Sequence, residues 1–527
     1  MPRVRKSKVG FILDYKYEIA LVIIAAILIF TNLGDRTFGG DENFGMEAVT
    51  NILSNGLPAV RNSSAINYSL TPTVNSPVSE YMMAGAVSLF GFSEFSARLP
   101  IAIFGVVSVI VMYMFALGLS KNRRTALIAL ILIVFSVVFY LHIRQARYYS
   151  IALLFNTVFI YAFYRYFVSG SGGRWKYILI TSIILLFYTH PETAVYTSVA
   201  AVLWLLIMRN SVKLKKVFGV FVPSVILLLP LFFAVATTKT YQITAAGLPP
   251  IMQLNFSGIF ALYIFTGVYY YLLFFVPFIF LFMIPKSMKK YDRRLLLLFL
   301  LVVLSHIVIA SISSPFGTPS IRKLFVGTFP IDVIFLAAAL NYLLDKKVVV
   351  KMLAVVLTLF LIFTNFVSLF PLAFFKAPLM QMNTPFIPDN IKDAFINKTL
   401  EPRYYFADFL YEVTHHYEST IENTLDALKG SPGMTVLYPG GFPMTPYMNE
   451  RGMKISSDIN DLNTIVFDWI VVESNNRILV TNSSYEKIDY SIPSYDDLWM
   501  DTADPVHHRF RSDNVPRIAV TIFHLVR

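Results

Sequence analysis

Residues 17–42 of the chain read YEIALVIIAAILIFTNLGDRTFGGDE, an apolar run of helix length that ends near two adjacent carboxylates. An apolar stretch of about 20 residues can cross a bilayer as a helix. Asp41 and Glu42 follow this run after only a short connection, so we expect both to lie where membrane meets water. The stretch therefore predicts a membrane-spanning helix that leads directly into a candidate site.

The composition of all 527 residues is that of a membrane protein. Hydrophobic residues make up 56% and charged residues 14%, whereas about 25% of a soluble domain is charged. The absence of cysteine excludes disulfides, thiol catalysis and thiolate metal sites. The net charge of +12 is divided into short clusters between apolar runs, which does not fit the continuous basic stripe of a nucleic-acid-binding protein.

The apolar runs predict about eleven membrane-spanning helices. Their expected ranges are 17–33, 99–119, 125–141, 150–167, 177–189, 194–208, 217–237, 259–284, 295–313, 324–344 and 352–370. The fifth and sixth runs meet at Pro191, which favours a sharp turn between two helices, and one kinked helix is the alternative. A cleaved signal peptide is the alternative for the first run.

Lysine and arginine recur in every second connection between the predicted spans, for example at 121–124, 209–216 and 286–294. Short cytoplasmic loops retain such residues. We therefore predict an integral plasma-membrane protein with a cytoplasmic amino terminus and an extracytoplasmic carboxy-terminal region.

Two regions do not read as membrane spans. Residues 34–95 form a long outer loop, and apolar residues at helical spacing within it predict two amphipathic helices on the outer surface. Residues 371–527 read as a soluble α/β domain, with strands expected at 435–438, 469–473, 478–481 and 518–525 after helices at 403–417 and 420–429. The predicted organisation is a mainly α membrane domain, 1–370, followed by an extracytoplasmic α/β domain, 371–527.

The sequence lacks the motifs of several reaction classes. The chain contains no GxxxxGK[ST], GxGxxG, HExxH, GxSxG or Asp-x-Asp motif, so direct use of nucleotides or nucleotide sugars is unsupported. His306 and Asp332 are the ionisable residues expected within the span interiors. Ion-coupled transporters need more such groups as relays, which argues against a pump or symporter.

The carboxylates after the first span are the leading candidates for chemistry. Asp41 or Glu42 could act as a general base toward a hydroxyl that lies within hydrogen-bond reach. An ordinary helix start explains the same pair, with Asp41 as the cap and Glu42 in the first turn.

Cations at the outer ends of later spans form a second candidate group. Arg144, Arg147 and Tyr148 lie between the third and fourth spans, and Arg322 and Lys323 precede a late span. A lipid-linked phosphate would suit these cations, and arginine in particular can bind it with two hydrogen bonds. Snorkelling of the long side chains into the headgroup region is the alternative.

His190 and Glu192 lie together at another outer boundary. They could orient a substrate or contribute to a metal site, although two groups do not make a metal site by themselves. An ordinary turn is the alternative.

The run from Gly39 to Pro100, the pattern Arg144-x-x-Arg147-Tyr148-Tyr149 and the segment from Arg322 to Pro330 together resemble the GT-C glycosyltransferases. The resemblance is to the branch of protein O-mannosyltransferases and aminoarabinose transferases that use polyprenyl-phosphate sugars. It implies a GT-C fold, Asp41 as catalytic base, inversion at the sugar carbon and late-helix cations on the lipid phosphate. Departures from the branch are Asn75 and Ser76, with the single Pro77, where many relatives have Lys before Pro-Pro, and Gln145 in place of an acid.

The resulting hypothesis is an inverting transferase (EC 2.4) of the cell envelope that moves a monosaccharide from a polyprenyl-phosphate carrier to an acceptor hydroxyl. Its partners would be membrane lipid, the lipid-linked sugar and a glycan, lipid or protein acceptor, with no nucleic acid. We expect no required cofactor and assign no metal ligand, while dependence on a divalent metal stays open. A lipid-linked glycan flippase or polymerase and a noncatalytic receptor or scaffold are the alternative functions.

Overall fold

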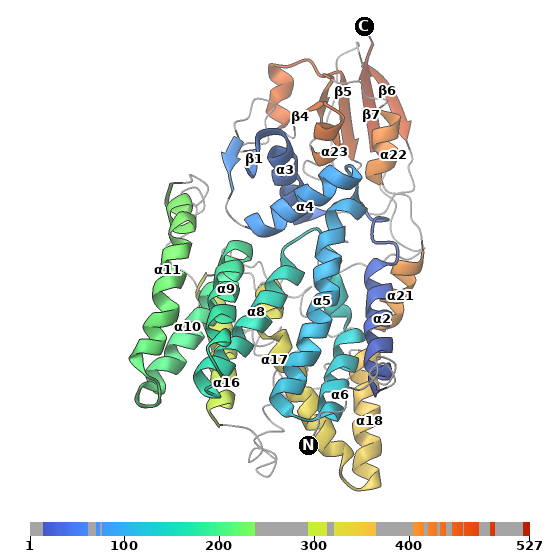
Figure 1. Cartoon of the computed structure of the whole chain (residues 1–527). Coiled ribbons are helices and arrows are strands. Elements are labelled where there is room, and N and C mark those ends of the chain that lie inside the picture. Colours follow the sequence, from blue (N-terminus) through green and yellow to red (C-terminus); the bar gives the residue numbers. More distant parts are fainter. Residues whose placement is uncertain are drawn as a thin grey trace, which may run out of the picture.

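The computed structural model describes residues 14–61, 70–73, 76–237, 293–313, 321–364, 404–415, 420–428, 433–438, 445–456, 458–473, 485–490 and 520–526. Within these ranges the molecule has a bundle of long helices at one end and a sheet at the other, with two shorter helices lying between them (Figure 1).

The described part of residues 34–95, the loop predicted to lie outside, forms the layer between the bundle and the sheet. The helix α2 (Lys16–Phe30) leads into α3 (Gly40–Asn55), the antiparallel strands β1 (Ala59–Arg61) and β2 (Leu70–Pro72), and then α4 (Pro77–Phe90). Buried side chains of α3 and α4, among them Met46 and Met83, share one apolar cluster. The two amphipathic helices expected in this loop are therefore present, and they pack on each other.

The remaining helices of the bundle are α5 (Glu94–Ser120), α6 (Arg123–Val134), α7 (Val137–Ile143), α8 (Tyr149–Phe163), α9 (Arg174–Thr189), α10 (Pro191–Ile207), α11 (Leu214–Thr237), α16 (Arg293–Ser313), α17 (Ile321–Leu344) and α18 (Val348–Phe363). A π-helical turn, Tyr164–Val168, extends α8. In the described ranges five helices are long and apolar enough to cross a membrane, or six if the bent pair α6 and α7 is one span. The span predicted at 259–284 lies outside the described residues.

The span predicted at 125–141 consists of two helices, α6 and α7. The chain bends by 62° between α6 and α7. Ser136 accounts for the new start, because its hydroxyl accepts a hydrogen bond from the Phe139 amide and so caps α7. In contrast, the turn expected at Pro191 separates two helices: α9 ends at Thr189 and α10 begins at Pro191.

Burial distinguishes central from peripheral spans. In α17, 94% of the apolar window is buried, compared with 22% in α11. The helix α17 packs against α6, α8, α10, α16 and α18 and forms the middle of the bundle, whereas α11 packs mainly on α9. The exposed apolar residues of α11 suit contact with lipid tails.

The carboxy-terminal region contributes α21 (Tyr405–Thr414), α22 (Thr420–Ala427), β3 (Thr435–Leu437), α23 (Thr445–Glu450), β4 (Lys454–Ser456), β5 (Trp469–Glu473), β6 (Tyr485–Tyr490) and β7 (Val520–Leu525). The strand order is β4-β3-β5-β7-β6, in which β3 runs parallel to β4 and β5, and β7 runs antiparallel to β5 and β6. The predicted strand at 478–481 lies outside the described residues, and β4 and β6 were not predicted.

The helix α21 does not pack with this sheet. Phe406, Phe409 and Val413 on its apolar face join the core of the helical bundle. In Figure 1 it lies beside α2, below the sheet. The helix expected at 403–417 therefore exists, but its buried face is part of the membrane bundle.

Candidate active site at the first outer loop

The turn from Gly39 to Glu42 begins α3. The Glu42 carboxylate accepts a hydrogen bond from the Gly39 amide at 3.3 Å, and the Glu42 amide donates to the Gly39 carbonyl at 2.8 Å. These contacts satisfy groups that a helix start otherwise leaves open. The turn is thus held by its own residues, and Asp41 lies within it.

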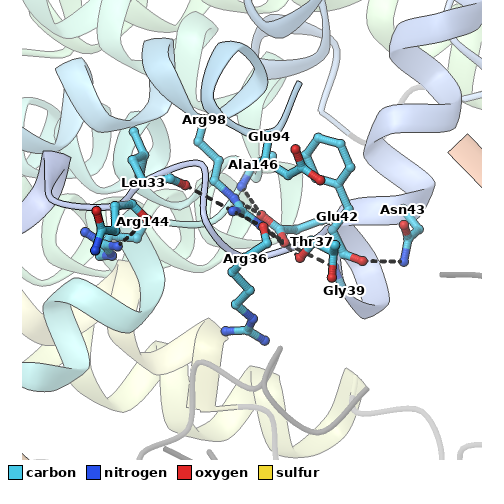
Figure 2. A network of polar contacts seen from close by, with 12 residues as sticks. Leu33, Arg36, Thr37, Gly39, Glu42, Asn43, Glu94, Arg98, Arg144 and Ala146 are labelled. Carbon is cyan, nitrogen blue, oxygen red and sulfur yellow. Dashed lines mark hydrogen bonds and ion pairs between the residues drawn. The ribbon is translucent and has the colours of Figure 1, made fainter. Parts of the chain in front are cut away.

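Glu42 forms a buried ion pair with Arg98 of α5 (Figure 2). Arg98 Nε is 3.0 Å from one carboxylate oxygen and Nη2 is 2.8 Å from the other, and the Ala146 amide donates to the first oxygen at 2.5 Å. Glu42 is 1% exposed. Burial opposes its ionisation, but the charge and hydrogen bonds of Arg98 outweigh this effect and lower the pKa of the carboxyl below its usual value.

Arg98 also holds the backbone that precedes the turn. Its guanidinium donates to the carbonyls of Leu33, Arg36 and Thr37 at 3.1, 2.5 and 3.2 Å. One arginine therefore links the end of α2 to the start of α3. Glu42 was expected beside Asp41 as a catalytic group, and the structure places its carboxylate in this buried ion pair, where it holds the turn.

Asp41 lies next to Glu42 in sequence but in a different environment. Neighbouring residues on a helix point about 100° apart. Asp41 forms an ion pair with Arg147, with Oδ2 2.5 Å from Nη2. Its side chain is 45% exposed while that of Arg147 is 9% exposed. A nearly buried cation thus holds a carboxylate that a hydroxyl in solution can still approach.

Aromatic rings extend this pair toward α10. The Arg147 guanidinium lies 4.8 Å from the centre of the Tyr149 ring and 5.5 Å from that of Tyr148. The Tyr148 ring stacks on His190 with centres 4.4 Å apart. Four residues predicted from separate parts of the sequence, Asp41, Arg147, Tyr148 and His190, therefore form one continuous chain of contacts.

His190 also caps α10. Its Nδ1 lies 2.7 Å from the Thr193 hydroxyl, and the ring accepts a weaker bond from the Thr193 amide. Glu192 is exposed in the first turn of the same helix. The turn explanation thus holds for His190, which additionally stacks on the candidate site through Tyr148.

Arg144 does not share the position of Arg147. It donates to the carbonyls of Leu28, Ile29 and Asn32 and so closes the carboxyl end of α2. Arg144 also lines a cavity of about 50 Å³ together with Arg36, Arg98 and Glu412. The structure thus places Arg144 at the end of α2 and Arg147 beside Asp41, and the binding of a lipid phosphate by either arginine stays a prediction.

The binding of a lipid phosphate by Arg322 and Lys323 remains a prediction, and dependence on a metal remains open. Arg322 and Lys323 lie in the first turn of α17, but their side chains are outside the described ones. In the ranges that the structure describes, no three His, Asp or Glu side chains gather as metal ligands.

Two residues of the site had no predicted role. Arg98 binds Glu42 of the turn, from which it is 56 residues away in sequence. Tyr447 accepts a hydrogen bond from Phe38 just before the turn, from which it is several hundred residues away. Arg98 belongs to the stretch that carries the family resemblance, which was the available signal. No local signal pointed to Tyr447.

A match to a protein-family model indicates the class of this protein. Residues 74–238 match the family model described as dolichyl-phosphate-mannose-protein mannosyltransferase. The matched segment contains α4 to α11, including Arg147, Tyr148 and His190. Together with the fold, this match confirms the resemblance to the GT-C glycosyltransferases.

Two solved structures are similar to most of this chain. The crystal structure of ArnT from Cupriavidus metallidurans bound to undecaprenyl phosphate is similar with a TM-score of 0.55 and 13% identity, covering 96% of this chain and 98% of ArnT. The oligosaccharyltransferase of Archaeoglobus fulgidus has a TM-score of 0.51 and 10% identity, covering 88% of this chain and 70% of that one. At these identities the similarity concerns the fold.

A sequence relative is also found in Aquifex aeolicus (strain VF5), an uncharacterized protein that is 25% identical over 213 residues. The alignment covers 38% of this chain and 40% of that relative.

Proposed function

We propose that this protein is an inverting glycosyltransferase that moves a monosaccharide from a polyprenyl-phosphate carrier to an acceptor hydroxyl on the extracytoplasmic side. The family model and the GT-C fold support a glycosyltransferase as the class. The observation that carries the residue assignment is the Asp41 carboxylate, which is accessible and yet fixed by Arg147 at 2.5 Å.

In this reaction Asp41 accepts the proton of the acceptor hydroxyl as the oxygen attacks the anomeric carbon. The bond from that carbon to the phosphate oxygen breaks on the opposite face, so the configuration inverts. The leaving polyprenyl phosphate is stable as an anion and needs no general acid. Positive charge directed at its oxygens lowers the barrier, and Arg322 and Lys323 in the first turn of α17 are the proposed source.

Arg147 has a positioning role in the proposal. Its ion pair restricts the Asp41 side chain, and the rings of Tyr148 and Tyr149 restrict Arg147 in turn. Such a preorganised base loses little entropy when the acceptor arrives. His190, stacked on Tyr148, supports the same arrangement.

The test is turnover of purified protein with a radiolabelled polyprenyl-phosphate sugar and an acceptor. We expect Asp41→Asn to lose about 10²-fold or more of the rate, because a positioned base contributes 10²- to 10⁴-fold, while its melting temperature stays near that of the wild type. Asp345→Asn is the matched control: Asp345 is 61% exposed and pairs with Arg124 at 2.6 Å, beyond the opposite end of α17.

Near-normal turnover in Asp41→Asn would remove the base assignment. Absence of free polyprenyl phosphate in the wild-type reaction would favour a flippase or a receptor instead. Nuclear magnetic resonance of the product reads the anomeric configuration, and retention would contradict the inverting mechanism.

A further inference from the structure

A tyrosine from the carboxy-terminal region reaches the backbone just before Asp41. The Phe38 amide donates to the Tyr447 hydroxyl at 2.8 Å, and that hydroxyl donates to the Glu94 carboxylate at the start of α5. Tyr447 belongs to α23, which packs on α3. One hydroxyl thus joins three elements that are distant in sequence.

The Tyr447 ring adds apolar contacts at the same point. Its centre lies 5.6 Å from that of Phe38 and 5.9 Å from that of Phe92. The Phe38 side chain is fully buried. Aromatic pairs at such distances stabilise the fold beyond the effect of the area that they bury.

The remaining groups around Phe38 are already engaged. The Phe38 carbonyl accepts a hydrogen bond from the side-chain amide of Asn43 at 3.3 Å, and the Arg98 guanidinium lies 5.5 Å from the centre of the Phe38 ring. Arg98 in turn holds Glu42, which is the neighbour of Asp41. The position of Phe38 is therefore connected to the position of Asp41 both along the chain and through Arg98.

The hydroxyl of Tyr447 is suited to this double role. Burial and the neighbouring Glu94 carboxylate raise its pKa well above the ordinary value for tyrosine. A neutral hydroxyl can donate one hydrogen bond and accept another. Tyr447 uses both, toward Glu94 and Phe38.

We propose that Tyr447 is a positioning residue for the Asp41 turn, through which the carboxy-terminal region sets the geometry of the reaction. The inference rests on the proposed function, because it gives Tyr447 a role through Asp41. It implies that the region that carries the sheet is a required part of the active site in addition to any part it takes in acceptor binding.

Tyr447→Phe tests this proposal, because it removes one oxygen and keeps the ring. Tyr485→Phe is the matched control: its hydroxyl donates to the Phe467 carbonyl at 2.8 Å, within the sheet region. We expect kcat to fall roughly tenfold or more in Tyr447→Phe with the KM for the lipid-linked sugar unchanged, since small displacements of a catalytic group cost up to about 10²-fold. Tyr485→Phe should keep the wild-type kcat, and its melting temperature measures the cost of removing one tyrosine hydroxyl from the same region.

A second measurement does not depend on activity. Hydrogen–deuterium exchange of residues 36–42 should be faster in Tyr447→Phe than in the wild type and in Tyr485→Phe. If wild-type protein transfers no sugar, the proposed function fails while the exchange result still decides whether Tyr447 orders the turn. Equal exchange in both variants, or equal kcat, would overturn the positioning role.

Discussion

Adjacent carboxylates can have different roles when their surroundings differ. Asp41 and Glu42 follow each other in one helical turn, yet Glu42 is buried against Arg98 and Asp41 is half-exposed beside Arg147. Removing one partner of a buried ion pair leaves the other charge uncompensated. Glu42 therefore belongs to the stability of the turn, and the exposed carboxylate is the one that can meet a substrate.

Glu80 in α4 is a buried carboxyl with a different environment. One of its oxygens accepts from the Ser76 hydroxyl at 3.1 Å, and the other has no hydrogen-bond partner among the described residues. Burial raises the pKa of Glu80 from 4.5 to about 7. The folded protein therefore retains this proton at a pH at which the unfolded chain has lost it.

This shift predicts a pH dependence of stability. The contribution of Glu80 is fully present below pH 4.5 and is lost as the pH rises through about 7. The free energy of unfolding should fall by about 3 kcal/mol over that interval from this group. Glu80→Gln cannot ionise, so melting temperatures between pH 5 and 8 should fall less in this variant than in the wild type.

The exposed Glu450 provides the control. Glu450→Gln should keep the wild-type pH dependence. If Glu80→Gln also keeps it, the carboxyl does not hold a proton in the folded protein near neutral pH.

At the scale of elements, α17 lacks one backbone hydrogen bond, and a side chain of another helix replaces it. Pro330 lacks an amide hydrogen, so the Val326 carbonyl has no partner within α17. The Asn156 amide of α8 donates to the carbonyls of Val326 and Gly327 at 2.9 and 3.1 Å. Thr197 of α10 fixes Asn156 by donating to its carbonyl oxygen at 2.7 Å. Three helices of the bundle thus meet at the proline.

Asn156→Leu should lower the free energy of unfolding by about 1–3 kcal/mol, because it leaves the buried Val326 carbonyl without its donor. The melting temperature of detergent-solubilised protein measures this loss. Thr157→Val is a suitable control, since the Thr157 hydroxyl donates to the Leu153 carbonyl of its own helix. Equal melting of the two variants would show that Asn156 does not stabilise this part of α17.

At the scale of the whole molecule, the proposal requires the outer loop and the basic connections to lie on opposite sides of the membrane. The chain contains no cysteine, so single cysteines can be labelled without background. A membrane-impermeant maleimide should label Asn55→Cys, at the exposed end of α3, in intact cells. It should label Asn210→Cys, in the exposed turn Arg209–Ser211, only after permeabilisation.

The reverse labelling pattern would invert the orientation and would put Asp41 in the cytoplasm. A polyprenyl-phosphate sugar would then have to react at the cytoplasmic face. The position of the proposed site relative to the membrane thus depends on this measurement, whereas its internal geometry does not.

Local features of the sequence determined the class of the protein and the place of its candidate site. Hydropathy indicates helices that cross a membrane because the bilayer requires long apolar segments, and Gly39 to Glu42 mark the start of α3 by composition alone. The packing of α21 on the bundle was not predicted, because it depends on neighbouring helices. The bend at Ser136 was not predicted either, because one capping serine within a long apolar run is a weak signal.

Only the tertiary structure decided which carboxylate is locked and which is accessible. Glu42 pairs with Arg98, which is 56 residues away in sequence. The backbone before the turn bonds to Tyr447 of the carboxy-terminal region. Periodicity and capping act over a few residues, whereas ion pairs and buried hydrogen bonds depend on which surfaces the folded chain brings together. Asp41 could therefore be named from the sequence, but its partner Arg147 and the support of its turn could be assigned only after folding.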